Sequence, residues 1–198
     1  MKIEYYYEIP SPLAYLESLK FQSIAKKYKA EIIQKLCELL GGIFAKIGRI
    51  SVPQRSPQRQ KYCLDKIKRW SNFLNIIINI KSKFFPPKDP HFPAKFTIAA
   101  NLLGTKIIFD HELLKLLWSE EKDISDEKNI EIISNKFKIN FEELSALAKS
   151  GKVTKIYMDN TVEAINQNVF GVPTYIFNNE LFWGQDRLEF LERALKNA

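Results

Sequence analysis

The chain is poor in cysteine and histidine. Among its 198 residues it has two of each, namely Cys37, Cys63, His91 and His111. The cysteines form neither a CxxC pair nor a metal-ligand spacing, so we expect no structural disulfide and no metal site. Neither histidine stands in a recognisable triad motif, which argues against an acyl-transfer serine enzyme.

Long hydrophobic runs are also missing. The most apolar stretch, Ile76–Ile80, is interrupted by Asn79 and is far shorter than the ~20 residues needed to cross a bilayer. The first residues reach Glu4 and Pro10 before any stretch that suits a signal peptide. We therefore expect no membrane segment and a cytoplasmic location.

The composition suits one compact domain, or one domain interrupted by an insertion, with 45% hydrophobic and 13% aromatic residues. The net charge of +7 is concentrated in one segment. There, Asp65 is the one acid among Lys46, Arg49, Arg55, Arg59, Lys61, Lys66, Lys68 and Arg69. Such a cluster is usually a solvated face, but it could attract a small anion, an acidic partner or nucleic acid.

The amino-terminal part has a β-α-β pattern. Residues 2–8 are dense in aromatic and β-branched side chains and predict a strand. Ser11 and Pro12 are typical of a helix start, and a second strand is expected at about 30–39, before Gly41 and Gly42.

The carboxyl-terminal part has a β-β-α pattern. Strands are expected at 174–177 and 180–183, with a turn at 178–179. Asp186 is expected to open a final amphipathic helix.

Between these parts, residues 53–151 have a helical pattern. A helix is expected to start at 124–127 and another to stop at Gly151, and Thr161 or Asp159 could cap a further short helix. The order predicts an α/β thioredoxin-like domain, residues 1–52 and 152–198, with an α-helical insertion domain at 53–151. In that fold a cis-proline belongs just before the third strand, where Val172-Pro173 stands.

The loop after the first strand carries a motif. Glu8-Ile-Pro-Ser-Pro-Leu-Ala-Tyr15 resembles the acidic-x-x-Ser-Pro-x-x-Tyr opening of the 2-hydroxychromene-2-carboxylate isomerase family, which is DsbA-like, and of kappa-class glutathione transferases. Further matches are 40–44, Tyr62 with Asp65, Arg69 and Trp70, then 118–126, 169–174 and 182–187. Where DsbA relatives carry Cys-x-x-Cys this chain has residues 11–14, Ser-Pro-Leu-Ala, which excludes disulfide exchange there.

The resemblance gives Ser11 a role beyond capping. Locally, Ser11 is an ordinary N-cap. The resemblance implies that glutathione is the cofactor and that its thiolate lies at the helix N-terminus, stabilised by the Ser11 hydroxyl and the helix dipole. In an isomerase this thiolate would add reversibly to a conjugated bond of the substrate and permit rotation about it.

The same resemblance implies further glutathione contacts. Val172 would pair its backbone with the cysteinyl unit, and Pro173 would fix the loop against the Ser11 helix. Asp186 would hold the γ-glutamyl end, with Gln185 adding a polar contact. A structural turn and a simple helix cap are the plainer interpretations of Pro173 and Asp186.

Two positions depart from the family pattern. Arg49 stands where the family often has Asn, and Arg59 stands where a Lys is usual. Both offer donors to a carboxylate of glutathione, but with a longer, flatter group. Trp183, Phe44 and Tyr15 are candidates for an apolar acceptor pocket, although such aromatics are more often core.

The sequence thus predicts a glutathione-dependent isomerase that acts on a small aromatic or conjugated substrate and forms a homodimer. One alternative keeps the fold and makes glutathione a consumed substrate, as in a kappa-class-like transferase or peroxidase. Another is a non-catalytic module that binds nucleic acid or an acidic protein through the basic segment. Only Tyr62 and Trp70 interleave with those charges, so nucleic acid is not expected.

Overall fold

The computed structural model describes residues 1–105 and 108–198, and it contains one four-stranded sheet. The strands are β1 (Lys2–Tyr7), β2 (Glu31–Leu36), β3 (Thr174–Phe177) and β4 (Glu180–Trp183), in the order β2-β1-β3-β4. The two carboxyl-terminal strands match their predicted bounds. The second strand is shorter than predicted, because the chain turns away after Leu36 into η1 (Leu39–Phe44), a π-helical segment.

The register brings distant segments to one edge of the sheet. β1 runs parallel to β2, so both strands end at the same edge. β3 runs antiparallel to β1, with Tyr6 opposite Thr174, so β3 begins where β1 ends. We call this the carboxyl edge: residues 8–11 after β1, 37–38 after β2, and 172–173 before β3.

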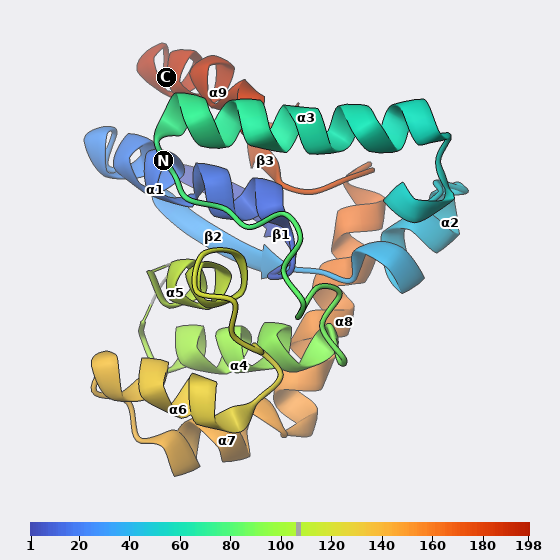
Figure 1. Cartoon of the computed structure of the whole chain (residues 1–198). Helices are drawn as coiled ribbons and strands as arrows, with labels where there is room; N and C mark the ends of the chain where they lie inside the picture. Colours follow the sequence, from blue (N-terminus) through green and yellow to red (C-terminus); the bar gives the residue numbers. More distant parts are fainter. Residues whose placement is uncertain (106–107) are drawn as a thin grey trace.

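Helices α1 (Pro12–Lys27) and α3 (Pro57–Leu74) lie on one side of the sheet, and α9 (Leu188–Lys196) ends the chain nearby (Figure 1). α3 crosses the top of the view in Figure 1 and contacts α1. None of its side chains is fully buried, so α3 is an amphipathic helix whose apolar side is only partly covered.

The remaining long helices form the lower part of the molecule in Figure 1. They are α4 (His91–Leu102), α5 (Ile108–Trp118), α6 (Glu127–Lys136), α7 (Phe141–Ala148) and α8 (Gly151–Asn166). Their core includes the buried side chains of Phe96, Leu113, Leu117 and Leu144. α8 contacts α4 and α7 as well as β2 and η1, so it joins the helical part to the sheet.

Two predictions about α8 are wrong. Gly151 does not stop a helix; Ser150 accepts a hydrogen bond from Val153 N, which makes Gly151 the first residue of α8. Neither Thr161 nor Asp159 caps a helix, because both lie inside α8. The Thr161 hydroxyl donates to Tyr157 O at 3.0 Å, and Asp159 pairs with Lys155 one turn away.

Other local predictions are confirmed. Ser11 caps α1 and Asp126 caps α6. The Val172–Pro173 peptide is cis. The final helix begins at Leu188 after a short 3-10 turn, η3 (Gln185–Arg187), two residues later than predicted. Among the described residues, no helix combines the length and apolar character that a bilayer crossing requires.

Candidate functional site

Ser11 lies at the carboxyl edge, where its backbone N donates to Glu8 O at 3.2 Å. Its side chain is 8% exposed, and its Oγ accepts a hydrogen bond from Ala14 N at 3.3 Å. A hydroxyl can donate as well as accept, and no acceptor for the Ser11 proton is found within the described chain. The Ser11 hydroxyl therefore keeps a donor available at the N-terminus of a 16-residue helix.

The Val172–Pro173 loop faces this helix start across the edge. The ladder ends with Tyr6 opposite Thr174, so Val172 and Pro173 come directly before β3 at the edge where β1 ends. Pro173 O accepts from Gly184 N at 2.9 Å. No residue in the described ranges bonds the Val172 backbone N–H or C=O, which leaves both groups able to pair with a peptide-like ligand.

Arg49 holds this loop from the outside. Its Nη1 donates to Phe170 O at 2.6 Å, and its guanidinium lies 4.9 Å from the ring centres of both Phe44 and Trp183. A side chain on Gly171 would come within 2.8 Å of Arg49 Nη1. Arg49, predicted to bind glutathione, is thus stacked between two aromatics with one amino group already bonded.

The other arginines nearby lack acidic partners. Burial lowers the pKa of Arg49, and the charges of Arg55 and Arg59 lower it further. No carboxylate within the described residues pairs with them. Arg59 is exposed on α3, and its guanidinium makes no hydrogen bond to the described chain. A ligand carboxylate is therefore a suitable counterion for this cluster.

Gln185 and Asp186 follow β4 at the same edge. Gln185 is 4% exposed, yet neither its Oε1 nor its Nε2 has a partner among the described residues. Such a buried, unpaired amide is costly unless a ligand or water completes it. Asp186 is partly engaged, since Lys66 of α3 lies 3.3 Å from it and Arg187 lies 3.7 Å away.

Two acids at the edge were not predicted as site residues. Glu8 follows β1 and Glu38 follows β2, and no cation of the described chain pairs with either. Burial and the nearby Glu38 charge raise the pKa of Glu8 to about 7. The acidic residue at the start of the Glu8–Ser11 motif was the one sign of Glu8 in the sequence. That Glu38 lies near it depends on the pairing of β1 with β2.

The aromatic candidates separate into two groups. Trp183 is 39% exposed and lies against Phe170, with ring centres 4.8 Å apart, beside Arg49. Phe44 is 7% exposed beneath the same guanidinium. Tyr15 is 4% exposed and stacks on His111, so its ring packs between α1 and α5. Tyr15 is therefore a core residue and not part of an acceptor pocket.

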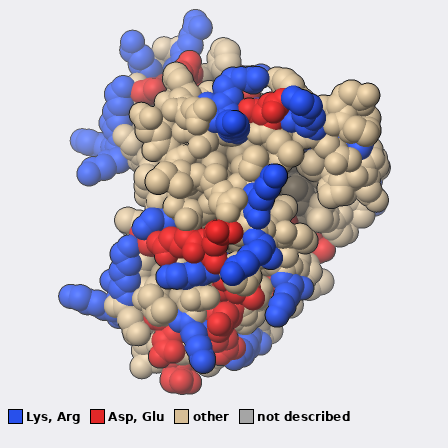
Figure 2. Space-filling model, in the orientation of Figure 1, with Lys and Arg blue, Asp and Glu red and all other residues tan. Residues whose placement is uncertain are grey.

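Charge is mixed on the face shown in Figure 2, where lysine and arginine side chains alternate with acidic ones above and below a largely uncharged band. On α3 itself, Lys61 pairs with Asp65 at 2.6 Å and Lys66 pairs with Asp186. The basic segment therefore does not form an uninterrupted positive field on this face.

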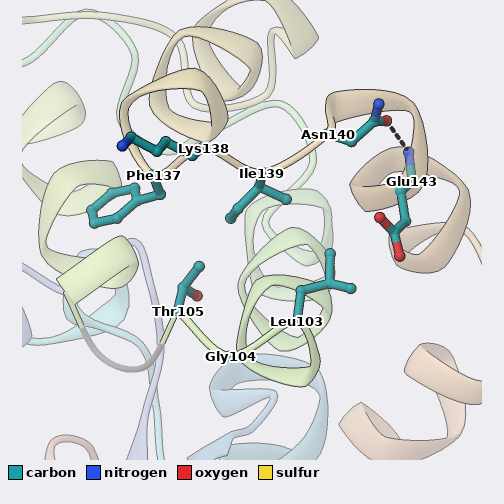
Figure 3. Close-up of a pocket in the computed structure, with 8 residues that line it drawn as sticks. All are labelled: Leu103, Gly104, Thr105, Phe137, Lys138, Ile139, Asn140 and Glu143. Carbon is teal, nitrogen blue, oxygen red and sulfur yellow. Dashed lines mark hydrogen bonds between the residues drawn. The ribbon is translucent and has the colours of Figure 1, made fainter.

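A separate pocket of about 450 Å³ lies in the helical part (Figure 3). Its walls are Leu103, Gly104, Thr105, Phe137, Lys138, Ile139, Asn140 and Glu143. The one polar contact drawn there is the α7 cap, in which Asn140 Oδ1 accepts from Glu143 N at 2.9 Å. No predicted site residue lines this pocket. Across the described ranges, no group of His, Cys, Asp and Glu could hold a metal ion.

Comparison with known proteins agrees with this architecture. The chain is 24% identical over 204 residues to 2-hydroxychromene-2-carboxylate isomerase of Pseudomonas putida, covering 98% of this chain and 94% of that one. It is 25% identical to glutathione S-transferase kappa 1 of Caenorhabditis elegans, covering 98% and 91%.

Solved structures show the same fold. A 2-hydroxychromene-2-carboxylate isomerase matches with a TM-score of 0.84 and 23% identity, covering 100% of this chain and 95% of that one. The cytosolic disulfide reductase DsbM of Pseudomonas aeruginosa with GSH matches with a TM-score of 0.70 and 12% identity, covering 99% and 100%. The model of the DSBA-like thioredoxin domain matches residues 2–196, and this chain accordingly belongs to the DSBA-like thioredoxin domain family.

Proposed function

We propose that this protein is an enzyme that binds glutathione at the carboxyl edge and uses its thiolate for isomerisation of a small conjugated or aromatic substrate. The relatives are isomerases and a glutathione transferase, which supports an enzyme of this group. The observation that carries the proposal is the Ser11 hydroxyl, which caps α1 through its oxygen while its proton has no acceptor among the described residues.

The chemistry follows from that position. A thiolate beside Ser11 would accept the hydroxyl proton as a hydrogen bond and lie at the positive end of the α1 dipole. Both effects lower a thiol pKa from about 8.5. The thiolate then adds to a conjugated double bond, the bond made single rotates, and elimination restores the thiolate and the double bond. Glutathione is regenerated in each cycle.

The other groups would bind the rest of glutathione. The unpaired backbone of Val172 suits the cysteinyl amide, and Pro173 fixes that loop by bonding Gly184. The buried amide of Gln185 and the carboxylate of Asp186 suit the γ-glutamyl end. Arg59 offers an unpaired guanidinium to a carboxylate, whereas Arg49 contributes chiefly by holding the loop.

The test is calorimetric titration with reduced glutathione, combined with the ultraviolet absorbance of the bound thiolate across pH. In the wild type we expect binding with a bound-thiol pKa below about 8.5; in Ser11→Ala we expect that pKa to rise. Ser23→Ala is the matched control, because Ser23 is exposed on the same helix. No binding at millimolar glutathione would overturn the cofactor assignment.

A transferase or peroxidase is the second candidate, favoured by the kappa-class relative. Product analysis separates the two activities, because isomerisation leaves total glutathione unchanged while conjugation or peroxide reduction consumes it. We further propose that the enzyme is cytoplasmic and homodimeric; fractionation of cells and light scattering of the purified protein test these two points.

A further inference from the structure

Glu8 is the acid closest in sequence to Ser11 at the carboxyl edge. Its backbone O accepts from Ser11 N at 3.2 Å, which ties the two residues into one turn. Its side chain is partly buried, and no hydrogen bond or ion pair reaches its carboxylate from the described chain. A partly buried carboxyl group without partners favours its protonated form, and beside a helix start it is placed to take up a proton.

Glu38 is the charged residue that acts on Glu8. Parallel pairing continues past the strands, since Cys37 N donates to Tyr7 O at 3.1 Å; this sets Cys37 beside Glu8, and Glu38 is the next residue along the chain. Glu38 is anchored through its backbone N, which donates to Thr161 Oγ1 at 2.9 Å. Burial and this neighbour raise the pKa of Glu8 to about 7.

Two other titratable groups beside Glu8, the Cys37 thiol and the Tyr157 hydroxyl, stay neutral at pH 7. Burial raises the pKa of the Cys37 thiol and of the Tyr157 hydroxyl, and the Glu8 charge adds to both effects. Tyr157 in turn lies 3.4 Å from His91 Nδ1. Asp89 is the further acid that affects Tyr157. No lysine or arginine of the described chain lies within 4.0 Å of Glu8 to hold it ionised.

We propose that Glu8 accepts the proton that bound glutathione loses when its thiolate forms. The inference rests on the proposed function. In the step, the thiol S–H bond breaks, its electron pair stays on sulfur, and the proton forms an O–H bond with the Glu8 carboxylate. When the thiolate leaves as thiol, the same proton returns.

The electrostatics explain why a local acceptor is useful. With Glu8 and Glu38 ionised, a thiolate would add a third negative charge to a partly buried edge. Transfer of the proton to Glu8 keeps the total at two charges. The Ser11 hydroxyl and the α1 dipole then stabilise the sulfur, while the proton stays near the reacting atoms.

A proton count tests this assignment. At pH 7.5, thiolate absorbance measures how much bound thiolate forms, and calorimetry in two buffers of different ionisation enthalpy measures how many protons reach the solvent. We expect wild-type protein to release well under one proton per thiolate, and Glu8→Gln to release about one. Glu8→Asp keeps a carboxylate and should restore the wild-type count.

Glu31→Gln is the matched control, because Glu31 begins β2 at the opposite end of the sheet and is exposed; its proton count should equal that of the wild type. Equal proton release per thiolate in wild type and Glu8→Gln would overturn the role of Glu8 and leave the glutathione site intact. If Glu8→Gln does not fold, the wild-type protein alone still tests the role of Glu8: release of one proton to the solvent per thiolate formed would overturn it. Absence of any bound thiolate in the wild type would overturn both proposals.

Discussion

Buried carboxyl groups occur in two regions of this molecule, and their surroundings differ. In the core, Glu17 is 1% exposed and accepts hydrogen bonds from the hydroxyls of Tyr5 and Tyr175. At the carboxyl edge, Glu8 is partly buried and accepts none from the described chain. Burial raises the pKa of both, to about 8 for Glu17 and about 7 for Glu8.

Glu17 has a structural role, whereas Glu8 is free to take part in chemistry. The tyrosines satisfy Glu17, so this acid and its partners act as a closed polar group that holds α1 against β1 and β3. Glu8 also has a raised pKa, but its carboxyl group has no hydrogen-bond partner in the described chain. A raised pKa therefore indicates function only where the group is also open to a ligand.

The largest expected effect comes from removing the core acid. Glu17→Ala leaves two buried tyrosine hydroxyls without an acceptor, so we expect the free energy of unfolding to fall by about 3 kcal/mol. Urea denaturation measures this, and glutathione binding by the remaining folded protein should be unchanged. Glu189→Ala, on the exposed side of α9, should not move the denaturation midpoint. A loss below about 1 kcal/mol would show that Glu17 is not a structural acceptor.

The next effect is a dependence of stability on pH. Unfolded, Glu17 titrates at its ordinary pKa of 4.5; folded, its pKa is about 8. Between these values the folded state holds a proton that the unfolded state has lost, so stability falls as pH rises, by up to about 1.4 kcal/mol per pH unit. Glu8 adds a slope of the same sign, but only up to about pH 7.

Urea denaturation from pH 5 to 8.5 measures that slope. Glu17→Gln should reduce the slope up to about pH 8, whereas Glu8→Gln should reduce it only up to about pH 7. An unchanged slope in Glu17→Gln would contradict the raised pKa of the core acid.

A smaller effect is expected from the arginine that holds the loop. Arg49→Ala removes the bond to Phe170 O and the stacking between Phe44 and Trp183. We expect glutathione binding to weaken about tenfold, or about 1.4 kcal/mol, with little change in the bound-thiol pKa. Arg49→Lys should recover part of the loss. An altered thiol pKa with unchanged affinity would instead place Arg49 among the groups that act on the sulfur.

The smallest effect is expected on the exposed face of α8. Lys155→Gln breaks the pair with Asp159, whose side chains are 74% and 61% exposed. Exposed pairs of this kind contribute little because water and salt screen them. The denaturation midpoint and glutathione binding should both match the wild type. A clear fall in either would show that this exposed ion pair contributes to stability or to binding.

The sequence was most informative where a local pattern decides the structure. The alternation and turn at 174–183 predicted two strands with their bounds, because hairpin register depends on a few adjacent residues. Ser11 before Pro12 predicted a capped helix for the same reason. Inside α8, Thr161 and Asp159 were misleading, since their side chains bond within the helix and to Glu38.

The sequence by itself determined the thioredoxin-like order of elements, the serine in place of a cysteine pair, and the proline before the third strand. Only the tertiary structure decided which side chains meet. Glu8 reaches Glu38 because β1 and β2 are parallel and end together. Gln185 is buried because η3 packs on α1, and Arg49 becomes a loop anchor because Phe44 and Trp183 enclose it. These contacts join residues far apart in the chain, and no local pattern encodes such distances.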